Sequence, residues 1–425
     1  MLPVFSAAAA AHVVPPAYSA FASAAKIKHV VIVVQENRSF DNLFQGYPGA
    51  NTVSSGVNSQ GQTVPLRPVP LQAPWGIDHD ATAYFAACDG SGSIPGTNCK
   101  MDAFDKEASF GGRRPANPAY AYVPHSQTKP YFDIAREFVL GDDMFTSNID
   151  ESFESHQYII AGQANAAVNE PAGGEGCGTP SSTVLTLLAN RTYGPTEAPC
   201  FSSTTIADEL DAKHLSWRYY AAGPTDLGYV WSAYQAIGQI YNGPQWTTNV
   251  KNPPAAFLKD VAKGRLAAVT WVTPTCATSD HASCLGKGGP DWVASVVNAV
   301  GESGFWDDTV VFVMWDEWGG WYDHVPPPYE DYDGLGIRVP LLVVSAYAKR
   351  HYVSHVQYEH GSILKFVENT FGLAPLAASD YRANSPAPDC LDFTKPPRPF
   401  VPIKTTLKPL DFINAPVDPR PPDDD

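Results

Sequence analysis

The chain has 425 residues, of which 44% are hydrophobic and 12% aromatic, and its formal net charge is −16. This length suffices for one large α/β domain with insertions or for two domains, and the apolar content supports a substantial core. The acidic balance argues against nucleic-acid partners and anionic membrane surfaces, because like charges repel. No apolar run is long enough for a membrane-spanning helix.

Residues 1–25 contain no Lys, Arg, Asp or Glu and are rich in Ala. A signal peptide has a basic start and a longer apolar core, so this stretch is an atypical one. We predict that it forms an N-terminal arm or is the remnant of a signal.

The first strand signal lies in residues 28–41, KHVVIVVQENRSFD, where an apolar run is unbroken from 30 to 34. Such a run of β-branched residues is typical of a strand buried on both faces of a parallel sheet. Gln35, Glu36 and Asn37 follow at once, where open α/β sheets place their ligands. We predict a site here; an ordinary polar turn after the strand is the alternative.

The middle of the chain alternates helical and extended patterns. We predict helices in residues 81–87, 130–138, 204–214 and 291–300 and strands in residues 216–220 and 267–273. Residues 139–162 have the composition of a polar, Ser-rich loop that leads into a helix from Glu154. Residues 165–255 combine Gly and Pro with aromatic side chains, and we predict an insertion or cap that lines a cleft.

A second buried strand is predicted in residues 309–315, TVVFVMW, and Asp316 and Glu317 follow it directly. If both strands are central in one sheet, these side chains meet Glu36 and Asn37 at a common rim. Three crowded carboxylates repel one another unless a cation lies among them. Oxygen donors suit Mg²⁺, Ca²⁺ or Mn²⁺ better than Zn²⁺, so we predict such a divalent ion. Two unrelated acidic turns are the alternative.

A further strand in residues 338–345 and a helix in residues 361–371 continue the alternation. The pattern predicts an α/β fold with a mostly parallel central sheet flanked by helices, and with loop insertions covering the site. We assign residues 26–385 to one domain and residues 386–425 to a Pro- and Asp-rich tail extended over the surface.

The seven cysteines follow no zinc-binding spacing. Six form neighbouring pairs in polar, Gly-rich or Pro-rich stretches: Cys88 with Cys99, Cys177 with Cys200, and Cys276 with Cys284. Cys390 is left over. Loop-closing disulfides are typical of exported proteins, so we predict at least two of them in a secreted or periplasmic protein. Scattered reduced thiols are the alternative.

Five motifs, taken in order, resemble those of the bacterial phosphoesterase family that includes phospholipases C and an acid phosphatase. They are ENRSFD at 36–41, TSNIDESF at 146–153, DEWGGWYDHVPPP at 316–328, GIRVPLLVVS at 336–345 and YEHGSILKFVE at 358–368. The resemblance covers most of residues 26–375 and implies a fold like that of alkaline phosphatase. Relatives vary at the residue after DE, which is Trp318 in this chain.

The resemblance also implies roles for individual residues. The implied metal ligands are Glu36, Asn37, Asp316, Glu317 and Ser152. A Ser or Thr of the middle loop would be the nucleophile, and its motif position assigns that role to Ser152. The rival hydroxyls are those of Thr146, Ser147 and Ser155. His79 and His281 would line the phosphate site, although His79 also suits a salt-linked loop, and His324 suits support of the Asp316 turn.

These side chains suit phosphoester chemistry. Metal coordination activates a serine hydroxyl, and a cation neutralises charge on phosphoryl oxygens. We therefore expect a metal-dependent hydrolase of small phosphoesters or phospholipids that acts through a phosphoserine, and we favour a broad-range acid phosphatase. A phospholipase C is the first alternative, because aromatic residues between 217 and 246 suit a lipid. A non-catalytic secreted binding protein with a degenerate site is the alternative of another class; the oligomeric state is open.

Overall fold

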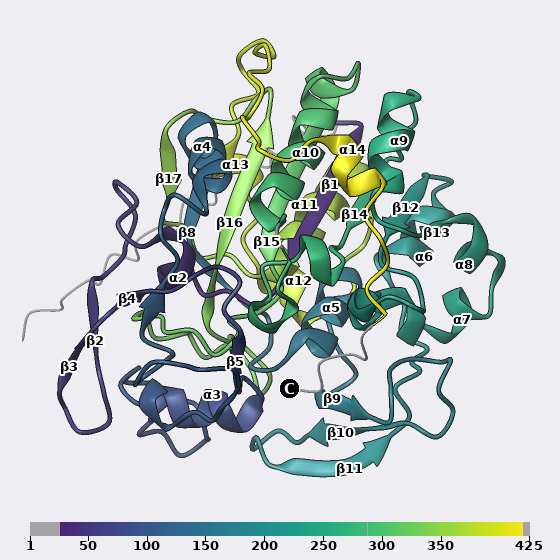
Figure 1. Ribbon diagram of the computed structural model, residues 1–425. Coiled ribbons are helices and arrows are strands. Elements are labelled where there is room, and N and C mark those ends of the chain that lie inside the picture. Colours follow the sequence, from purple (N-terminus) through teal and green to yellow (C-terminus); the bar gives the residue numbers. More distant parts are fainter. Residues whose placement is uncertain (1–25, 287, 420–425) are drawn as a thin grey trace, which may run out of the picture.

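The computed structural model describes residues 26–286 and 288–419, so the arm predicted in residues 1–25 lies outside the described residues. Within the described part, a central sheet of eight strands has helices on both faces (Figure 1). From one edge to the other its strands are β13 Val250–Lys251, β12 Trp217–Tyr220, β14 Val269–Val272, β1 His29–Gln35, β15 Thr309–Trp315, β16 Arg338–Ser345, β8 Val139–Phe145 and β17 Tyr352–Ser354. The predicted α/β class is confirmed.

The sheet is mostly parallel, as predicted. Among its described strands, β16 alone runs against its neighbours, β15 and β8. The loop of residues 316–337 starts and ends at the same edge of the sheet, so the strand that follows it must run back. Buried apolar composition does not reveal this direction, because it is the same for both orientations.

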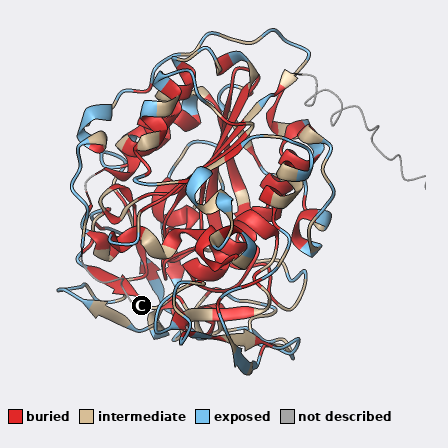
Figure 2. Cartoon of the chain, turned by 90° about the vertical axis from the view of Figure 1, so that its right-hand side faces the viewer, coloured by how far each residue is buried: buried red, intermediate tan, exposed pale blue. Residues whose placement is uncertain are grey.

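Helices cover both faces of the sheet. One face carries α4 Lys129–Glu137, α9 Ala256–Ala262 and α10 Gly289–Gly301, and the other carries α5 Ser152–Ala161, α6 Ile206–Ala212, α11 His360–Phe371 and α12 Ala378–Arg382. The sheet between these layers is buried, as Figure 2 shows. Covering on both faces explains why β1 and β15 are apolar without alternation.

The register of the two central strands fixes the place of the acidic residues. β1 pairs with β15 in parallel, and Gln35 lies opposite Trp315. Glu36 and Asp316 are the next residues on each chain, so both leave the sheet side by side at its carboxyl edge. The predicted common rim is therefore present.

The prediction for residues 139–162 was wrong in part. Residues 139–145 form strand β8, and helix α5 begins at Ser152, two residues before the predicted start. Asp142 is one of the polar residues that made this segment resemble a loop. It is 1% exposed, and its carboxylate accepts hydrogen bonds from the Asn51 backbone N–H and from His355. These partners are distant in the sequence, so local composition did not indicate them.

The predicted cap region contains a small sheet of its own. Strands β9 Ala167–Ala172, β10 Thr183–Leu187 and β11 Tyr193–Glu197 form a three-stranded antiparallel sheet beside the central one (Figure 1). β12 and β13, also within residues 165–255, belong to the central sheet. The domain limits stay predictions. The tail, expected to be extended, includes two short helices, α13 Ala387–Cys390 and α14 Pro409–Ile413.

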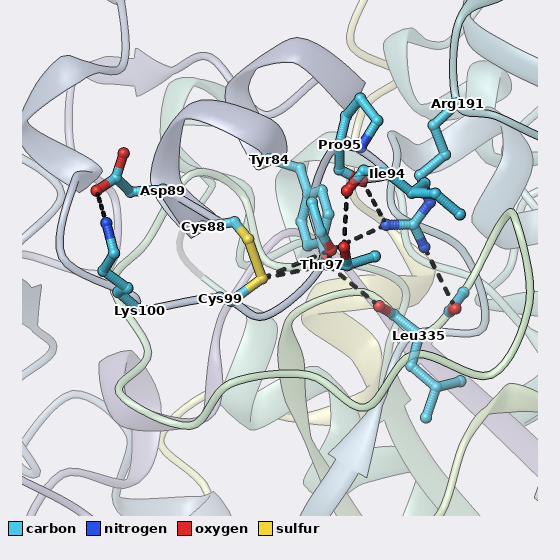
Figure 3. Close-up of a disulfide and its surroundings, with 12 residues drawn as sticks. Tyr84, Cys88, Asp89, Ile94, Pro95, Thr97, Cys99, Lys100, Arg191 and Leu335 are labelled. Atoms are coloured by element: carbon cyan, nitrogen blue, oxygen red, sulfur yellow. Dashed lines mark hydrogen bonds and ion pairs between the residues drawn. A yellow bond between two sulfur atoms is a disulfide. The ribbon is translucent and has the colours of Figure 1, made fainter. Parts of the chain in front are cut away.

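The three predicted disulfides are present: Cys88–Cys99, Cys177–Cys200 and Cys276–Cys284. Cys390 is a free thiol and is buried. The loop closed by the first disulfide binds the cap region, because Arg191 donates to the carbonyls of Pro95 and Gly96 at 3.0 and 2.9 Å (Figure 3). Among residues 26–286 and 288–419, no helix has the length and apolar character needed to span a membrane.

A buried carboxyl pair away from the sheet edge makes stability depend on pH. Glu368 of α11 is 3% exposed, and burial together with a hydrogen bond to Asp380 of α12 raises the pKa of Glu368 to about 9. The folded state thus keeps a proton that the unfolded chain releases above about pH 4.5. The contribution of this pair to the free energy of unfolding is therefore fully present below about pH 4.5 and is lost as the pH rises toward 9.

Glu368→Gln should therefore raise the melting temperature at pH 8 by several degrees, because the amide keeps a donor toward Asp380 without a titrating proton. At pH 4.5 the same variant should melt within about a degree of the parent. Thermal unfolding followed by circular dichroism at both pH values measures this difference. An equal shift at the two pH values would contradict the assigned proton.

Candidate active site

Two loops at the carboxyl edge of the sheet are joined by hydrogen bonds from the backbone of one of them. The backbone N–H of Asn37 donates to Asp316 Oδ1 at 3.0 Å, and that of Arg38 donates to the Glu317 carbonyl at 2.9 Å. Gly319 makes the close approach possible. It has a φ of +64°, and a Cβ there would lie 2.3 Å from the Asn37 carbonyl oxygen. The four predicted ligands therefore converge, each at most 2% exposed.

The tightest polar group at this edge consists of Glu36, Asp316 and His156. His156 Nε2 lies 3.1 Å from Glu36 Oε1 and 3.7 Å from Asp316 Oδ2. Burial, together with nearby carboxylate charge, raises the pKa of Glu36 to about 8 and raises the pKa of Asp316 well above its usual range. Burial lowers the pKa of His156 to about 4, so its imidazole is neutral.

This group fits a divalent cation. Among the described residues, no N–H or hydroxyl group donates a hydrogen bond to the buried oxygens Glu36 Oε2 and Asp316 Oδ2. Buried carboxylate oxygens without a donor are unfavourable, because they lose their hydration and gain nothing in return. A divalent ion between them would supply the missing positive charge. One donor atom each from Glu36, His156 and Asp316 lies within 4.8 Å of the others, as one ion requires.

Ser152 lies at the first turn of α5 and faces the same edge. Its Oγ donates to Asn37 Oδ1 at a distance of 3.4 Å. Both side chains line a cavity of about 70 Å³ together with His79 and His281. The structure thus brings the nucleophile predicted from the motif to the predicted ligands and to both predicted histidines.

The rival hydroxyls are held elsewhere. Thr146 Oγ1 donates to the Asn148 carbonyl at 2.6 Å, Ser147 Oγ to Glu359 Oε2 at 2.9 Å, and Ser155 Oγ to Asn148 Oδ1 at 3.1 Å. Among the described residues that line the cavity, only Ser152 carries a hydroxyl group. Geometry therefore favours Ser152 over its three rivals.

The two predicted histidines occupy different positions in the cavity. His79 Nδ1 lies 2.7 Å from the Ile77 carbonyl oxygen, so it carries the proton, and Nε2 accepts from Asn37 Nδ2 at 3.1 Å. This hydrogen bond orients the Asn37 side-chain amide so that Asn37 Oδ1 faces Ser152. The ring of His281 packs on Trp231 with centroids 5.9 Å apart. The contacts of His79 with Ile77 and Asn37 account for its position, so the predicted alternative of a salt link to the neighbouring aspartates is not needed.

His324 lies apart from the cavity. Its Nδ1 is 2.6 Å from Asp41 Oδ2, and Asp41, Asp323 and His324 form a second group of possible metal ligands. The Arg338 guanidinium lies 3.1 Å from Asp323 and 3.6 Å from Asp41, so it already supplies the counter-charge there. This cluster fixes the loop that carries Asp316, in agreement with the predicted supporting role. Trp318 packs edge-on against Phe104 at 5.7 Å between ring centroids.

His156 is the site residue that the sequence prediction missed. It lies four residues after Ser152, so both side chains share one face of α5. The predicted helix began at Glu154, which left Ser152 in a loop and hid this spacing. Glu151 and Glu170 were also not selected; they line the cavity beside Ser152 and make its rim acidic.

The Cys276–Cys284 disulfide closes the loop that contains His281, and Cys284 itself lines the cavity. Replacing both cysteines by Ser should lower kcat/KM by about ten- to a hundredfold, because we expect His281 to act on the substrate and small displacements of such a group are costly. Removal of Cys88–Cys99 by the same substitutions is the control for general destabilisation, since that pair lies outside the cavity lining. Equal losses in both double variants, measured below their melting temperatures, would contradict a positioning role.

Carboxylate, imidazole and hydroxyl groups meet at the carboxyl edge of the sheet, an arrangement suited to the hydrolysis of phosphoric esters. The chain belongs to the Phosphoesterase family, whose sequence model matches residues 27–374. The family resemblance predicted from the five motifs is thus confirmed.

Curated relatives carry phospholipase C names. Non-specific phospholipase C6 of Arabidopsis thaliana is 26% identical over 392 residues, covering 82% of this chain and 68% of that protein. Non-hemolytic phospholipase C of Burkholderia pseudomallei (strain K96243) is 24% identical, with coverage of 81% and 55%. Phospholipase C B of Mycobacterium tuberculosis is 23% identical, with coverage of 88% and 80%. The chain thus spans between about half and four fifths of these relatives.

Solved structures align less closely. The PsFucS1 sulfatase from Pseudoalteromonas sp. has a TM-score of 0.45 at 10% identity, covering 91% of this chain and 78% of that one. A protein in the alkaline phosphatase superfamily from Vibrio parahaemolyticus has a TM-score of 0.37 at 11% identity, covering 82% and 68%. At these TM-scores the fold class rests on the strand order and direction of this chain itself.

Proposed function

We propose that this protein is a phospholipase C that hydrolyses phospholipid phosphodiesters with Ser152 as nucleophile. The observation that carries the proposal is the position of Ser152 Oγ, 3.4 Å from Asn37 Oδ1 in a cavity with two imidazoles. The names of the relatives support a phospholipid over the monoesters that the sequence favoured. Leu227, Val230 and Trp231 give the cavity an apolar wall suited to the glycerol end of a lipid.

The residues suggest a double displacement. His281 takes the hydroxyl proton as Ser152 Oγ bonds to phosphorus, and returns it to the diacylglycerol oxygen as the bond from phosphorus to that oxygen breaks. Water then attacks the phosphoserine; His281 accepts its proton and passes it to Ser152 Oγ as the phosphorylated head group leaves. His79 is engaged at both nitrogens, so we assign it to positioning Asn37.

The proposed enzyme requires a divalent metal. When bound, the ion would lower the pKa of the serine hydroxyl and neutralise charge on the phosphoryl oxygens. The proposed ligands are Glu36, Asn37, Asp316, Glu317 and Ser152. The oxygens Glu36 Oε2 and Asp316 Oδ2, which accept no hydrogen bond from an N–H or hydroxyl group of the described residues, support this assignment.

A broad-range phosphatase is the second candidate. The cavity volume of about 70 Å³ favours it, because that space holds a phosphoryl group and little more. A phospholipid would have to leave its acyl chains outside the cavity. A non-catalytic binding protein with a degenerate site is disfavoured, because every predicted ligand and the nucleophile lie at one sheet edge.

Hydrolysis of phosphatidylcholine and of a soluble aryl phosphate monoester, measured side by side, distinguishes these functions. We expect release of diacylglycerol with a kcat/KM at least tenfold above that for the monoester. A Ser152→Ala preparation controls for contaminating hydrolases. A preference for the monoester would replace the phospholipase proposal by the phosphatase, and no turnover of either substrate by metal-loaded protein would favour the binding protein.

A further inference from the structure

One side chain in the carboxylate group is not an oxygen donor. His156, on α5, is 1% exposed, and its imidazole points at two carboxylates that follow two different strands, β1 and β15. The sequence-based expectation of Mg²⁺, Ca²⁺ or Mn²⁺ assumed a donor set made only of oxygen. A buried nitrogen within that set changes the chemistry of the site.

The spacing of the three donors matches the edges of a coordination polyhedron. Two donors that each lie about 2.1 Å from one ion are about 3.0 Å apart at a right angle and about 3.4 Å apart at a tetrahedral angle. His156 Nε2 lies 3.1 Å from Glu36 Oε1 and 3.7 Å from Asp316 Oδ2. The first distance falls within this range and the second exceeds it by about 0.3 Å, so both carboxylate oxygens lie close to where a single ion bound to this nitrogen would need them.

Helix geometry holds this nitrogen next to the nucleophile. Ser152 and His156 are four residues apart on α5, and Ser152 contacts Asn37, the residue that follows Glu36. A rigid helix turn thus links the serine oxygen to the imidazole. Contact with Asp316 as well as Glu36 distinguishes this imidazole from one that orients a single carboxylate.

We propose that His156 is a nitrogen ligand of the active-site metal, and that the site selects a transition ion such as Zn²⁺, Co²⁺, Fe²⁺ or Mn²⁺ over Mg²⁺ and Ca²⁺. Imidazole binds transition ions well, whereas Mg²⁺ and Ca²⁺ take oxygen donors. This inference rests on the proposed function in one respect, namely that the site holds a divalent metal.

Metal binding by protein stripped with a chelator tests the proposal. Competitive titration with a chromophoric chelator should give Zn²⁺ and Co²⁺ dissociation constants that rise by about a hundredfold or more in His156→Ala, since even residues that only orient ligands account for about ten- to a hundredfold. The Ca²⁺ and Mg²⁺ constants should change by less than about tenfold. His360→Ala is the matched control, because His360 is also fully buried on a helix but contacts the Trp315 carbonyl rather than a carboxylate.

A spectroscopic readout identifies the ligand directly. Pulsed electron paramagnetic resonance of the Mn²⁺-loaded or Cu²⁺-loaded protein should show ¹⁴N coupling that weakens in His156→Ala and persists in His360→Ala. Unchanged coupling and unchanged Zn²⁺ affinity in folded His156→Ala would overturn the proposal, leaving His156 as a residue that orients Glu36. Failure of the proposed function is a separate outcome: the wild-type protein would bind no divalent ion, or would bind one and hydrolyse no phosphoester.

Discussion

Ser152→Ala is expected to reduce kcat by about three to six orders of magnitude and to leave the fold intact. Removal of a covalent nucleophile has effects of this size, because the remaining site offers only binding and electrostatic stabilisation. Ser152 is also the first residue of α5, but the N-cap is Glu151, so the substitution should cost less than the about 1 kcal/mol of a lost helix-capping hydroxyl. Loss of the nucleophile would therefore lower kcat by orders of magnitude, whereas loss of helix stability would lower the melting temperature by a small amount.

Trapping of the intermediate measures the same prediction independently of rate. Wild-type protein quenched in acid during turnover should carry one phosphoryl-containing group on the peptide with Ser152, whereas Ser152→Ala should carry none. Ser155→Ala is the matched control on the same helix, since Ser155 Oγ donates to Asn148 Oδ1 rather than facing the cavity. It should keep most of the activity and the label.

Two outcomes would contradict the role of Ser152 as the nucleophile. A folded Ser152→Ala variant that retains more than a few per cent of activity would move the nucleophile to Thr146, Ser147 or Ser155. If each of the four hydroxyls can be removed singly without loss, attack by an activated water would replace the covalent route.

Asp316→Asn is expected to remove the bound metal and to lower activity by at least about a thousandfold. The substitution keeps the shape of the side chain but replaces one of the two carboxyl groups that would hold the ion beside His156 by a neutral amide. Neutral amide oxygen is a weaker donor than carboxylate for a divalent ion. Elemental analysis of the purified variant and its rate of phosphoester hydrolysis measure the two parts of this prediction. Hydrolysis by the wild-type protein after chelation tests the same dependence on metal.

Asp333→Asn is the control for loss of a buried carboxyl group. Asp333 is 1% exposed and accepts a hydrogen bond from Tyr158 at 2.5 Å, but it does not line the cavity among the residues described. Burial raises the pKa of Asp333 to about 7, so an amide is a close replacement at mildly acidic pH. This variant should keep its metal. Retention of stoichiometric metal by Asp316→Asn, or chelator-resistant hydrolysis by the wild type, would contradict a metal centre at Asp316.

The nitrogen donor beside Glu36 and Asp316 comes from a distant part of the chain, so the sequence predicted a site made only of oxygen donors. Glu36 and Asp316 were selected because each lies within two residues of the end of an apolar run, and that rule depends only on neighbours in the chain. His156 follows no strand and has no metal-binding partner within its own segment. Its contacts lie 120 residues away at Glu36 and 160 residues away at Asp316 in the printed numbering. Only the packing of α5 across the sheet edge brings them together.

The sequence by itself determined the elements whose signals are local. The β-branched runs of β1 and β15 defined two buried strands, because such residues pack well in a pleated sheet covered on both faces. Cysteines close together in polar loops defined the three disulfides for a similarly local reason. The motif around Ser152 also singled out that residue, although its helix was placed two residues too late.

The tertiary structure alone decided the rest. It gave β8 its place in the sheet, because Asn51, His355 and Arg338 supply partners to Asp142 that composition did not predict. It reversed β16, because strand direction depends on where a loop returns and not on which residues are apolar. It separated Ser152 from its rival hydroxyls by their hydrogen-bond partners, and it added an imidazole to the carboxylates. Each of these depends on contacts between distant segments, which form only when the whole sheet and its two helix layers pack together.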